Sequence, residues 1–284
     1  MCPRPARVDN EPLRRIFALM PRSSSSGGRS PTWAWVVIAV GAVILAVGLP
    51  MVMGRGQLSQ AEVSRMDAEI QAMHVADQLA SRKLRVLVIG DSYTGGSNQG
   101  GEGASSWPRL VAADMTAAGY DADVSVLVAG GGGYTAQALG EGTTFVDLVR
   151  AAPEDPYDLV VVFGSRNDTA RQAEVKAAAS ELFAVVRLRY PEAELLVIGP
   201  PWVDENPPPN VIASRDAVAS AATETGAAFV DPLADGWFAG EFSSLIGTDG
   251  IQPTDDGHRH MADLIRPIIE DRLFASTAPS SSPP

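Results

Sequence analysis

From residue 84 onward, short apolar runs alternate with longer segments of helical periodicity. The runs, rich in β-branched and aliphatic residues, predict strands at residues 84–90, 123–129, 158–163, 194–199 and 227–230. Apolar positions at helical spacing predict helices near residues 106–118, 137–150, 171–190, 211–225 and 255–274. This alternation indicates right-handed crossovers and a parallel sheet with helices on both faces. We therefore expect an α/β domain over residues 83–274, a three-layer α/β/α sandwich.

A long uncharged run precedes this domain. Residues 33–53 are almost wholly apolar, and a run of that length spans the hydrocarbon core of a bilayer. Residues 1–32 are rich in Ser, Gly and Pro and carry six Arg against Asp9 and Glu11, which predicts a disordered cytoplasmic tail. We expect a single-pass membrane anchor with the rest of the chain exported. A cleaved signal peptide is the alternative, although no small-x-small site follows the run cleanly.

Two further segments flank the predicted domain. Residues 54–82 predict a helical stalk, whose apolar positions recur at helical spacing: Val63, Met66, Ile70 and Met73. The pattern leaves open a stalk, a docking helix or a short coiled coil through which the chain self-associates. Residues 275–284 are rich in Ser and Pro and predict a disordered tail.

Charge and cysteine content exclude several classes of partner. The 284 residues carry a net charge of −12, and removal of the tail charges leaves 16 basic and 32 acidic residues, a net of −16. Such an acidic chain is not typical of nucleic-acid binding or of contact with an anionic lipid surface. The single cysteine, Cys2, excludes an intramolecular disulfide and a cysteine metal site. We expect no metal and no cofactor.

Polar and glycine-rich segments follow the first three predicted strands, and a fourth lies late in the chain. They are Gly90-Asp91-Ser92, Gly130–Gly133, Gly164-Ser165-Arg166-Asn167-Asp168, and Asp249-Gly250-Ile251-Gln252-Pro253 with Gly257-His258. Ligands of open parallel sheets bind beyond the carboxyl ends of the strands, so we expect the first three segments to converge.

The residue types in these segments fit nucleophilic catalysis. Ser92 is a candidate nucleophile if a base removes its proton. A glycine of the 130–133 run brings a backbone N–H close to a developing oxyanion, and Asn167 offers an amide N–H to the same atom. Asp249 is placed to orient a base.

Simpler interpretations exist for each segment. Asp91 and Ser92 also fit a capped turn, and Asn167-Asp168 also fits the N-cap of the next helix. The glycine run fits a tightly packed turn. It does not fit a phosphate loop, which needs Lys-Ser/Thr after the glycines, nor a dinucleotide fingerprint, whose third glycine is replaced by Thr135.

The order Gly-Asp-Ser, Gly, Gly-x-x-Asn-Asp and Asp-x-x-Gln-Pro resembles the four-block pattern of the SGNH (GDSL-type) hydrolases, whose fourth block is Asp-x-x-His-Pro, over residues 84–272. The resemblance implies a flavodoxin-like domain that hydrolyses esters with a serine nucleophile and no metal. It implies substrates with O-acyl groups, often acetyl, on envelope carbohydrate or lipid. By position it assigns roles to the matching residues: Ser92 as nucleophile and oxyanion donor, Gly132 or Gly131 as backbone donor, Asn167 as side-chain donor, Asp249 as triad acid.

The fourth block departs from the family pattern, because Gln252 stands at the position of the triad His. A glutamine amide does not accept and return a proton near neutral pH. Two interpretations follow: an esterase of weak activity, or an inactive binding or scaffold protein of the cell envelope. His258 and His260 are the candidate substitute bases; otherwise His258 is a surface or capping residue.

Overall fold

The computed structural model describes residues 59–80, 82–140 and 142–275. It contains one parallel five-stranded sheet of order β2-β1-β3-β4-β5. The strands are β1 (Lys83–Gly90), β2 (Asp121–Val128), β3 (Leu159–Phe163), β4 (Glu194–Ile198) and β5 (Ala228–Val230). The predicted parallel α/β sandwich is confirmed, with each strand within two residues of its expected bounds.

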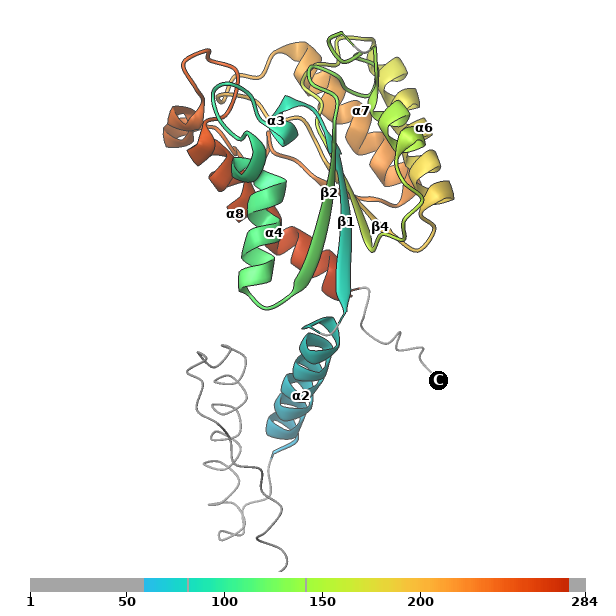
Figure 1. Cartoon of the computed structure of the whole chain (residues 1–284), viewed down its shortest axis with the longest axis vertical. Coiled ribbons are helices and arrows are strands. Elements are labelled where there is room, and N and C mark those ends of the chain that lie inside the picture. The colour runs from blue at the N-terminus through green and yellow to red at the C-terminus, as the bar shows by residue number, and fades with distance from the viewer. Residues whose placement is uncertain (1–58, 81, 141, 276–284) are drawn as a thin grey trace, which may run out of the picture. The chain divides into compact units, whose positions relative to one another are not determined.

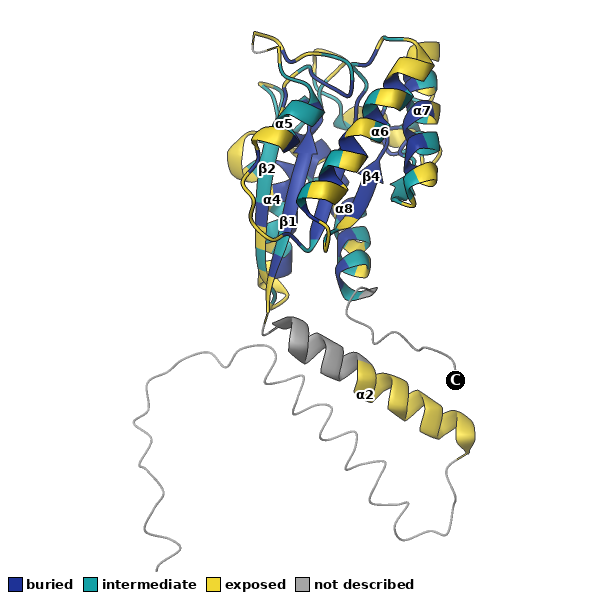
Figure 2. Ribbon diagram, turned by 90° about the vertical axis from the view of Figure 1, so that its right-hand side faces the viewer, coloured by how far each residue is buried: buried dark blue, intermediate teal, exposed yellow. Residues whose placement is uncertain are grey.

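Helices cover both faces of the sheet (Figure 1). The larger ones are α4 (Trp107–Ala117), α5 (Phe145–Ala151), α6 (Gln172–Arg189), α7 (Pro209–Thr225) and α8 (Asp255–Ala275). Successive strand residues point to opposite faces. Leu87 and Ile89 of β1 therefore pack with α5, α6 and α7, whereas Val86 and Val88 pack with α4 and α8. The central strands β1, β3 and β4 are consequently buried on both sides (Figure 2), whereas most residues of the edge strands β2 and β5 are half-buried or exposed.

The predicted helix at 137–150 is wrong in its first half. Residues 134–140 and 142–144 are not helical, and α5 begins only at Phe145. Gly140 and Gly142 adopt φ values of +83° and +68°, which interrupt a right-handed helix. The helix begins instead at a capping box made by Thr144 and Asp147.

The segment before the sheet contains helix α2 (Gln60–Ala80), close to the predicted stalk. Val63, Met66 and Ile70 are exposed on it. Among the described residues, no helix is both long and apolar enough to cross a membrane. The predicted anchor at 33–53 and the tail beyond residue 275 lie outside the described residues, so both stay predictions.

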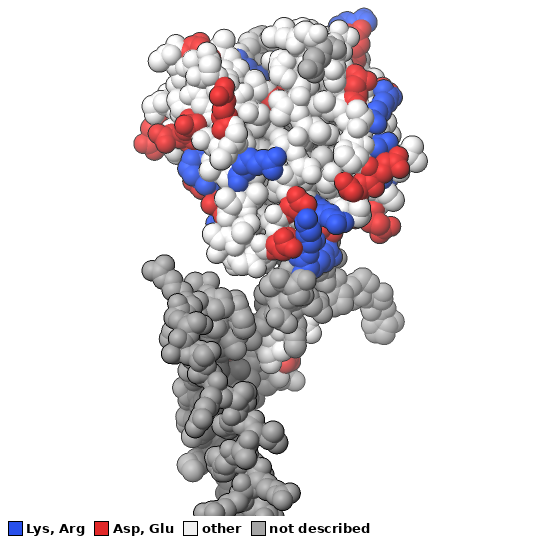
Figure 3. All heavy atoms as spheres, viewed as in Figure 1, with Lys and Arg blue, Asp and Glu red and all other residues white. Residues whose placement is uncertain are grey.

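The strand order places a topological switch point at β1 and β3. The chain leaves β1 toward β2 on one side and returns to β3 on the other, and ligands bind at the carboxyl edge of such a sheet where the order reverses. Acidic and basic side chains are interspersed on the face shown in Figure 3.

Candidate active site

Ser92 lies in a tight turn at the carboxyl end of β1. Asp91 caps the short helix α3 (Ser92–Gly95), because its Oδ1 accepts the Tyr93 N–H at 2.9 Å. Gly90 is required before this turn, since a Cβ there would lie 2.1 Å from Thr94 Oγ1. The half-buried Ser92 hydroxyl has no hydrogen-bond partner in the described part of the chain. The turn thus presents a serine without a protein base bound to it.

Asn167, after β3, reaches both other segments at this edge. Its Nδ2 donates to Asp91 Oδ2 at 3.0 Å and to the Gly132 carbonyl at 2.9 Å. Ser165 supports the arrangement: its Oγ donates to the same Gly132 carbonyl at 2.9 Å and accepts the Asn167 N–H at 3.0 Å. The structure therefore brings together the first three predicted segments, as their positions after parallel strands required.

The glycine run uses its backbone differently from the prediction. The Gly132 N–H donates to the Ala129 carbonyl at 2.8 Å, so the carbonyl and not the N–H of Gly132 faces Asn167. The Gly133 N–H is likewise engaged, with the Ala136 carbonyl at 2.9 Å. Gly131, with a φ of +71°, has an N–H without a hydrogen-bond partner among the described residues. Of the two glycines predicted as oxyanion donor, Gly131 therefore has the available N–H.

Asp168 holds the loop that follows the glycine run. Its carboxylate accepts the backbone N–H groups of Tyr134, Thr135 and Ala136 at 3.1, 2.7 and 2.9 Å, and the Thr135 hydroxyl at 2.7 Å. It does not cap the next helix, as the simpler interpretation expected, because α6 has Arg171 as its N-cap. Asp168 is thus a buried anchor between the second and third segments.

Asp91 is the most perturbed acid of the site. Burial raises its pKa from 3.8 to about 7, and the carboxylate of Asp168 adds to the rise. The hydrogen bond from the Tyr93 N–H and the charge of Arg166 act in the opposite direction. The sequence pattern predicts Asp91 as a turn residue. Its position between Gly90 and the candidate nucleophile Ser92 also indicates that it belongs to the site.

The fourth segment forms a turn held by Asp249. Its exposed carboxylate accepts the Ile251 and Gln252 N–H groups through Oδ1, at 2.8 and 2.9 Å. The side-chain Oε1 of Gln252 is buried and has no partner within the described chain. Asp249 therefore contacts Gln252 through the main chain, and the side-chain pair of a triad is not formed.

His258 is a core residue. The interpretation of it as a surface or capping residue is therefore wrong. Its ring is fully buried, and Nδ1 accepts the Trp107 N–H at 3.3 Å. A Cβ at Gly101 would lie 2.0 Å from Nε2, so that nitrogen is enclosed as well. Burial lowers the pKa of His258 to about 4, against the opposing charge of Asp255. An enclosed imidazole with so low a pKa is a weak proton acceptor out of reach of Ser92 Oγ, so His258 does not fit a substitute base.

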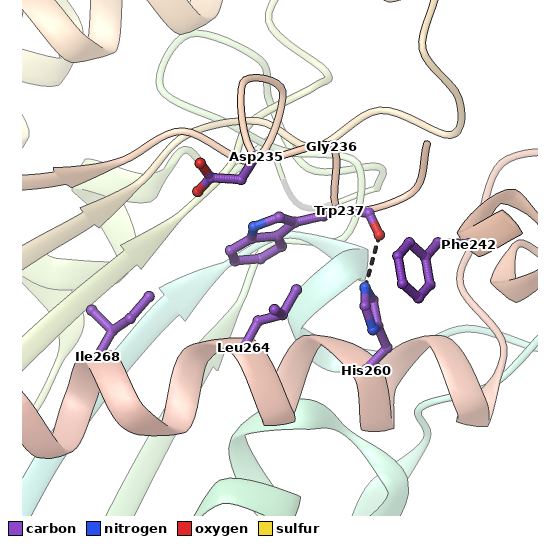
Figure 4. Close-up of a pocket in the computed structure, with 7 residues that line it drawn as sticks. All are labelled: Asp235, Gly236, Trp237, Phe242, His260, Leu264 and Ile268. Atoms are coloured by element: carbon purple, nitrogen blue, oxygen red, sulfur yellow. Dashed lines mark hydrogen bonds between the residues drawn. The ribbon is translucent and has the colours of Figure 1, made fainter. Parts of the chain in front are cut away.

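His260 lines a hollow between residues 235–242 and α8 (Figure 4). Its Nε2 lies 2.8 Å from the Trp237 carbonyl, and its ring stacks on Phe242 with centroids 4.5 Å apart. These contacts involve neither Ser92 nor Gln252. Among the described residues, no group of three or more His, Cys, Asp or Glu side chains is arranged to hold a metal.

The strand order, with the serine turn at the switch point, defines a flavodoxin-like α/β fold. Residues 88–260 match the GDSL-like Lipase/Acylhydrolase family, and the chain belongs to this family. GDSL lipase Rv0518 of Mycobacterium tuberculosis is 40% identical over 192 residues, which cover 66% of this chain and 82% of that protein.

Solved structures of low sequence identity share the fold. A family two carbohydrate esterase from Clostridium thermocellum, in complex with cellohexaose, has a TM-score of 0.55 and 18% identity over 68% of this chain and 66% of that one. TesA has a TM-score of 0.54 and 18% identity over 66% of this chain and 99% of its own.

Proposed function

We propose that this protein is a serine esterase of weak activity that acts on O-acyl groups, such as O-acetyl, of envelope carbohydrates or lipids. One observation carries the proposal: the Asn167 amide, bound between Asp91 and the Gly132 carbonyl, lies at the same sheet edge as the Ser92 turn. At this place a side-chain N–H can reach the oxyanion that forms on the substrate carbonyl oxygen when Ser92 attacks.

The reaction would proceed in two steps. Ser92 Oγ attacks the ester carbonyl carbon and loses its proton to water, while Asn167 and backbone N–H groups stabilise the oxyanion. The C–O bond to the alcohol then breaks, the alcohol leaves with a proton from solvent, and water hydrolyses the acyl-serine. Gln252 leaves both proton transfers to solvent, so the rate retains only the contribution of binding and the oxyanion site, about 10³–10⁴ over water in triad-deficient serine hydrolases.

Two relationships support the substrate class. The family is one of lipases and acylhydrolases, and a carbohydrate esterase with cellohexaose shares the fold.

A second candidate function is an inactive binding or scaffold protein of the envelope. The arrangement of the fourth segment favours it, because Asp249 bonds to backbone N–H groups and Gln252 Oε1 has no partner within the described chain. Such a protein would bind an acylated ligand at the sheet edge that carries Ser92 and would not turn it over.

Labelling with a fluorophosphonate separates the two candidates. An esterase of weak activity should label slowly at Ser92 and hydrolyse p-nitrophenyl acetate above the buffer rate, with both signals abolished by Ser92→Ala. Ser243→Ala, at an exposed serine of η2 (Gly240–Leu245), is the matched control and should change neither signal. Absence of labelling and turnover in the natural protein would leave the binding protein as the function.

We also propose that residues 33–53 anchor the chain with the domain outside the cell. The six arginines of residues 1–32 and the uncharged run support this orientation. Protease added to intact cells should then digest the domain, whereas digestion only after lysis would refute the orientation.

Self-association through α2 is a further proposal, testable by sedimentation with and without residues 54–82.

A further inference from the structure

Arg166 lies next to Asn167 in the chain and uses one nitrogen to join the segment that carries Ser92 to the segment that carries Gln252. Its Nη1 donates to the Tyr93 hydroxyl at 2.8 Å and to the Ile251 carbonyl at 2.9 Å. The Tyr93 hydroxyl in turn donates to the same Ile251 carbonyl at 2.5 Å. The three groups form a closed triangle of hydrogen bonds, which we call the Arg166 clamp.

Each member of the clamp adjoins a residue of the proposed site. Tyr93 follows Ser92, Arg166 precedes Asn167, and Ile251 precedes Gln252. The positions 92 and 252 are otherwise far apart in sequence, and the segment that carries Asp249 and Gln252 is largely exposed. The clamp therefore fixes that segment against the sheet edge through neighbouring residues and not through the site side chains themselves.

The surroundings of the clamp keep Tyr93 protonated and contact the Arg166 cation. Tyr93 is fully buried, and burial raises its pKa to about 12, so the hydroxyl keeps its proton at neutral pH. The guanidinium of Arg166 lies 4.5 Å from the Trp202 ring centroid and 5.4 Å from that of Tyr93. No ion pair joins Arg166 to a carboxylate in the described part of the chain; aromatic faces and the Tyr93 and Ile251 oxygens contact this cation, and the Asp91 carboxylate attracts it from farther away.

We propose that Arg166 is a positioning residue, which holds the 249–253 segment in register with Ser92 and so sets how well residue 252 serves the reaction. The proposal rests on the esterase function proposed above, for its catalytic consequence only. The clamp's effect on the segment itself is independent of any activity.

A lysine does not replace Arg166 fully. The guanidinium offers two N–H groups from one nitrogen in a fixed plane, aimed at two oxygens, and stacks on Trp202. Lys keeps the charge without that geometry, so Arg166→Lys should fall between the natural protein and Arg166→Met. Arg109→Met is the matched control, because Arg109 also bonds a backbone carbonyl, that of Val124 at 2.7 Å, but in β2.

Hydrogen–deuterium exchange of peptides covering residues 246–254 in the full chain tests the clamp directly. Arg166→Met should accelerate exchange there by about tenfold, because loss of its hydrogen bonds should raise the equilibrium constant for local opening by about that factor. Tyr93→Phe, a second variant that removes only the hydroxyl, should accelerate it by a smaller factor. Unchanged exchange in both variants, or an equal rise in Arg109→Met, would overturn the proposal.

The catalytic consequence is measured in a double-mutant cycle with Gln252→His. The gain in kcat for p-nitrophenyl acetate should be at least about tenfold smaller in Arg166→Met than in the natural background, with KM little changed, and Arg166→Lys should restore part of it. An equal gain in both backgrounds would refute the positioning role. No gain in any background, together with faster exchange in Arg166→Met, would instead count against the esterase function while the clamp stands.

Discussion

The Nδ2 atom of Asn167 lies 3.0 Å from Oδ2 of Asp91, and its second hydrogen points to the Gly132 carbonyl at 2.9 Å. Both amide hydrogens of the proposed oxyanion donor are thus engaged before any substrate binds. The oxyanion that forms on the substrate carbonyl oxygen when Ser92 attacks would have to share one of them, and the carboxyl of Asp91 competes for the same donor. The Asp91–Asn167 pair therefore orients the amide and also limits its availability.

Asn167→Ala should lower kcat for p-nitrophenyl acetate in the Gln252→His variant by roughly 10²–10³-fold, the usual effect of removing one oxyanion donor. The melting temperature should be recorded beside the kinetics. Asn98→Ala, at an exposed asparagine of the nearby 96–101 loop, is the control and should leave kcat unchanged. A fall of less than threefold for Asn167→Ala in a folded protein would remove Asn167 from the proposed site.

Asp168→Ala should lower the free energy of unfolding by about 3–5 kcal/mol, because it leaves three backbone N–H groups and a hydroxyl without their buried acceptor. Asp147→Ala removes a more exposed cap of α5 and should cost only about 1 kcal/mol. Urea unfolding measures both. Equal losses in the two variants would show that Asp168 is no special anchor of the glycine loop.

Asp91 should make the protein less stable as the pH rises. Its pKa is about 7 in the folded chain and 3.8 in a solvated one, so folding takes up a proton between these values. The free energy of unfolding should therefore fall as the pH rises from about 4 to about 7 and level off above. Urea unfolding across this pH range gives the free energy of unfolding of the natural protein and of Asp91→Asn, and the difference between the two isolates the contribution of Asp91. A difference that is flat or grows with pH would contradict the buried, proton-binding Asp91.

The architecture was predictable because the strands repeat a strong local pattern. Runs such as Val86–Ile89 are apolar at every position, which only a strand buried on both faces requires, and the intervening helices have the matching period. The convergence of Ser92, Asn167 and the glycine run follows from strand parallelism alone. Distant contacts were not needed for these predictions.

The failures concern residues whose partners lie far away in the sequence. Asp168 resembles a helix cap locally, but its partners are 32–34 residues earlier. His258 occupies a polar stretch, and only Trp107 and Gly101, more than a hundred residues away, enclose it. Neither local propensity nor periodicity contains such information. Gly132 belongs to the same class, because the direction of its N–H depends on the turn with Ala129.

Gln252→His tests most directly the proposal that Ser92 is a nucleophile whose base is missing. A histidine at 252 should raise kcat for p-nitrophenyl acetate by on the order of a hundredfold or more, since loss of a triad base usually costs at least that much. The gain should disappear when Ser92→Ala is added, because base and nucleophile act as a unit. A natural protein that is already fully active, is unaffected by Gln252→His and loses its activity in a folded His258→Gln variant would contradict the account and make His258 the base.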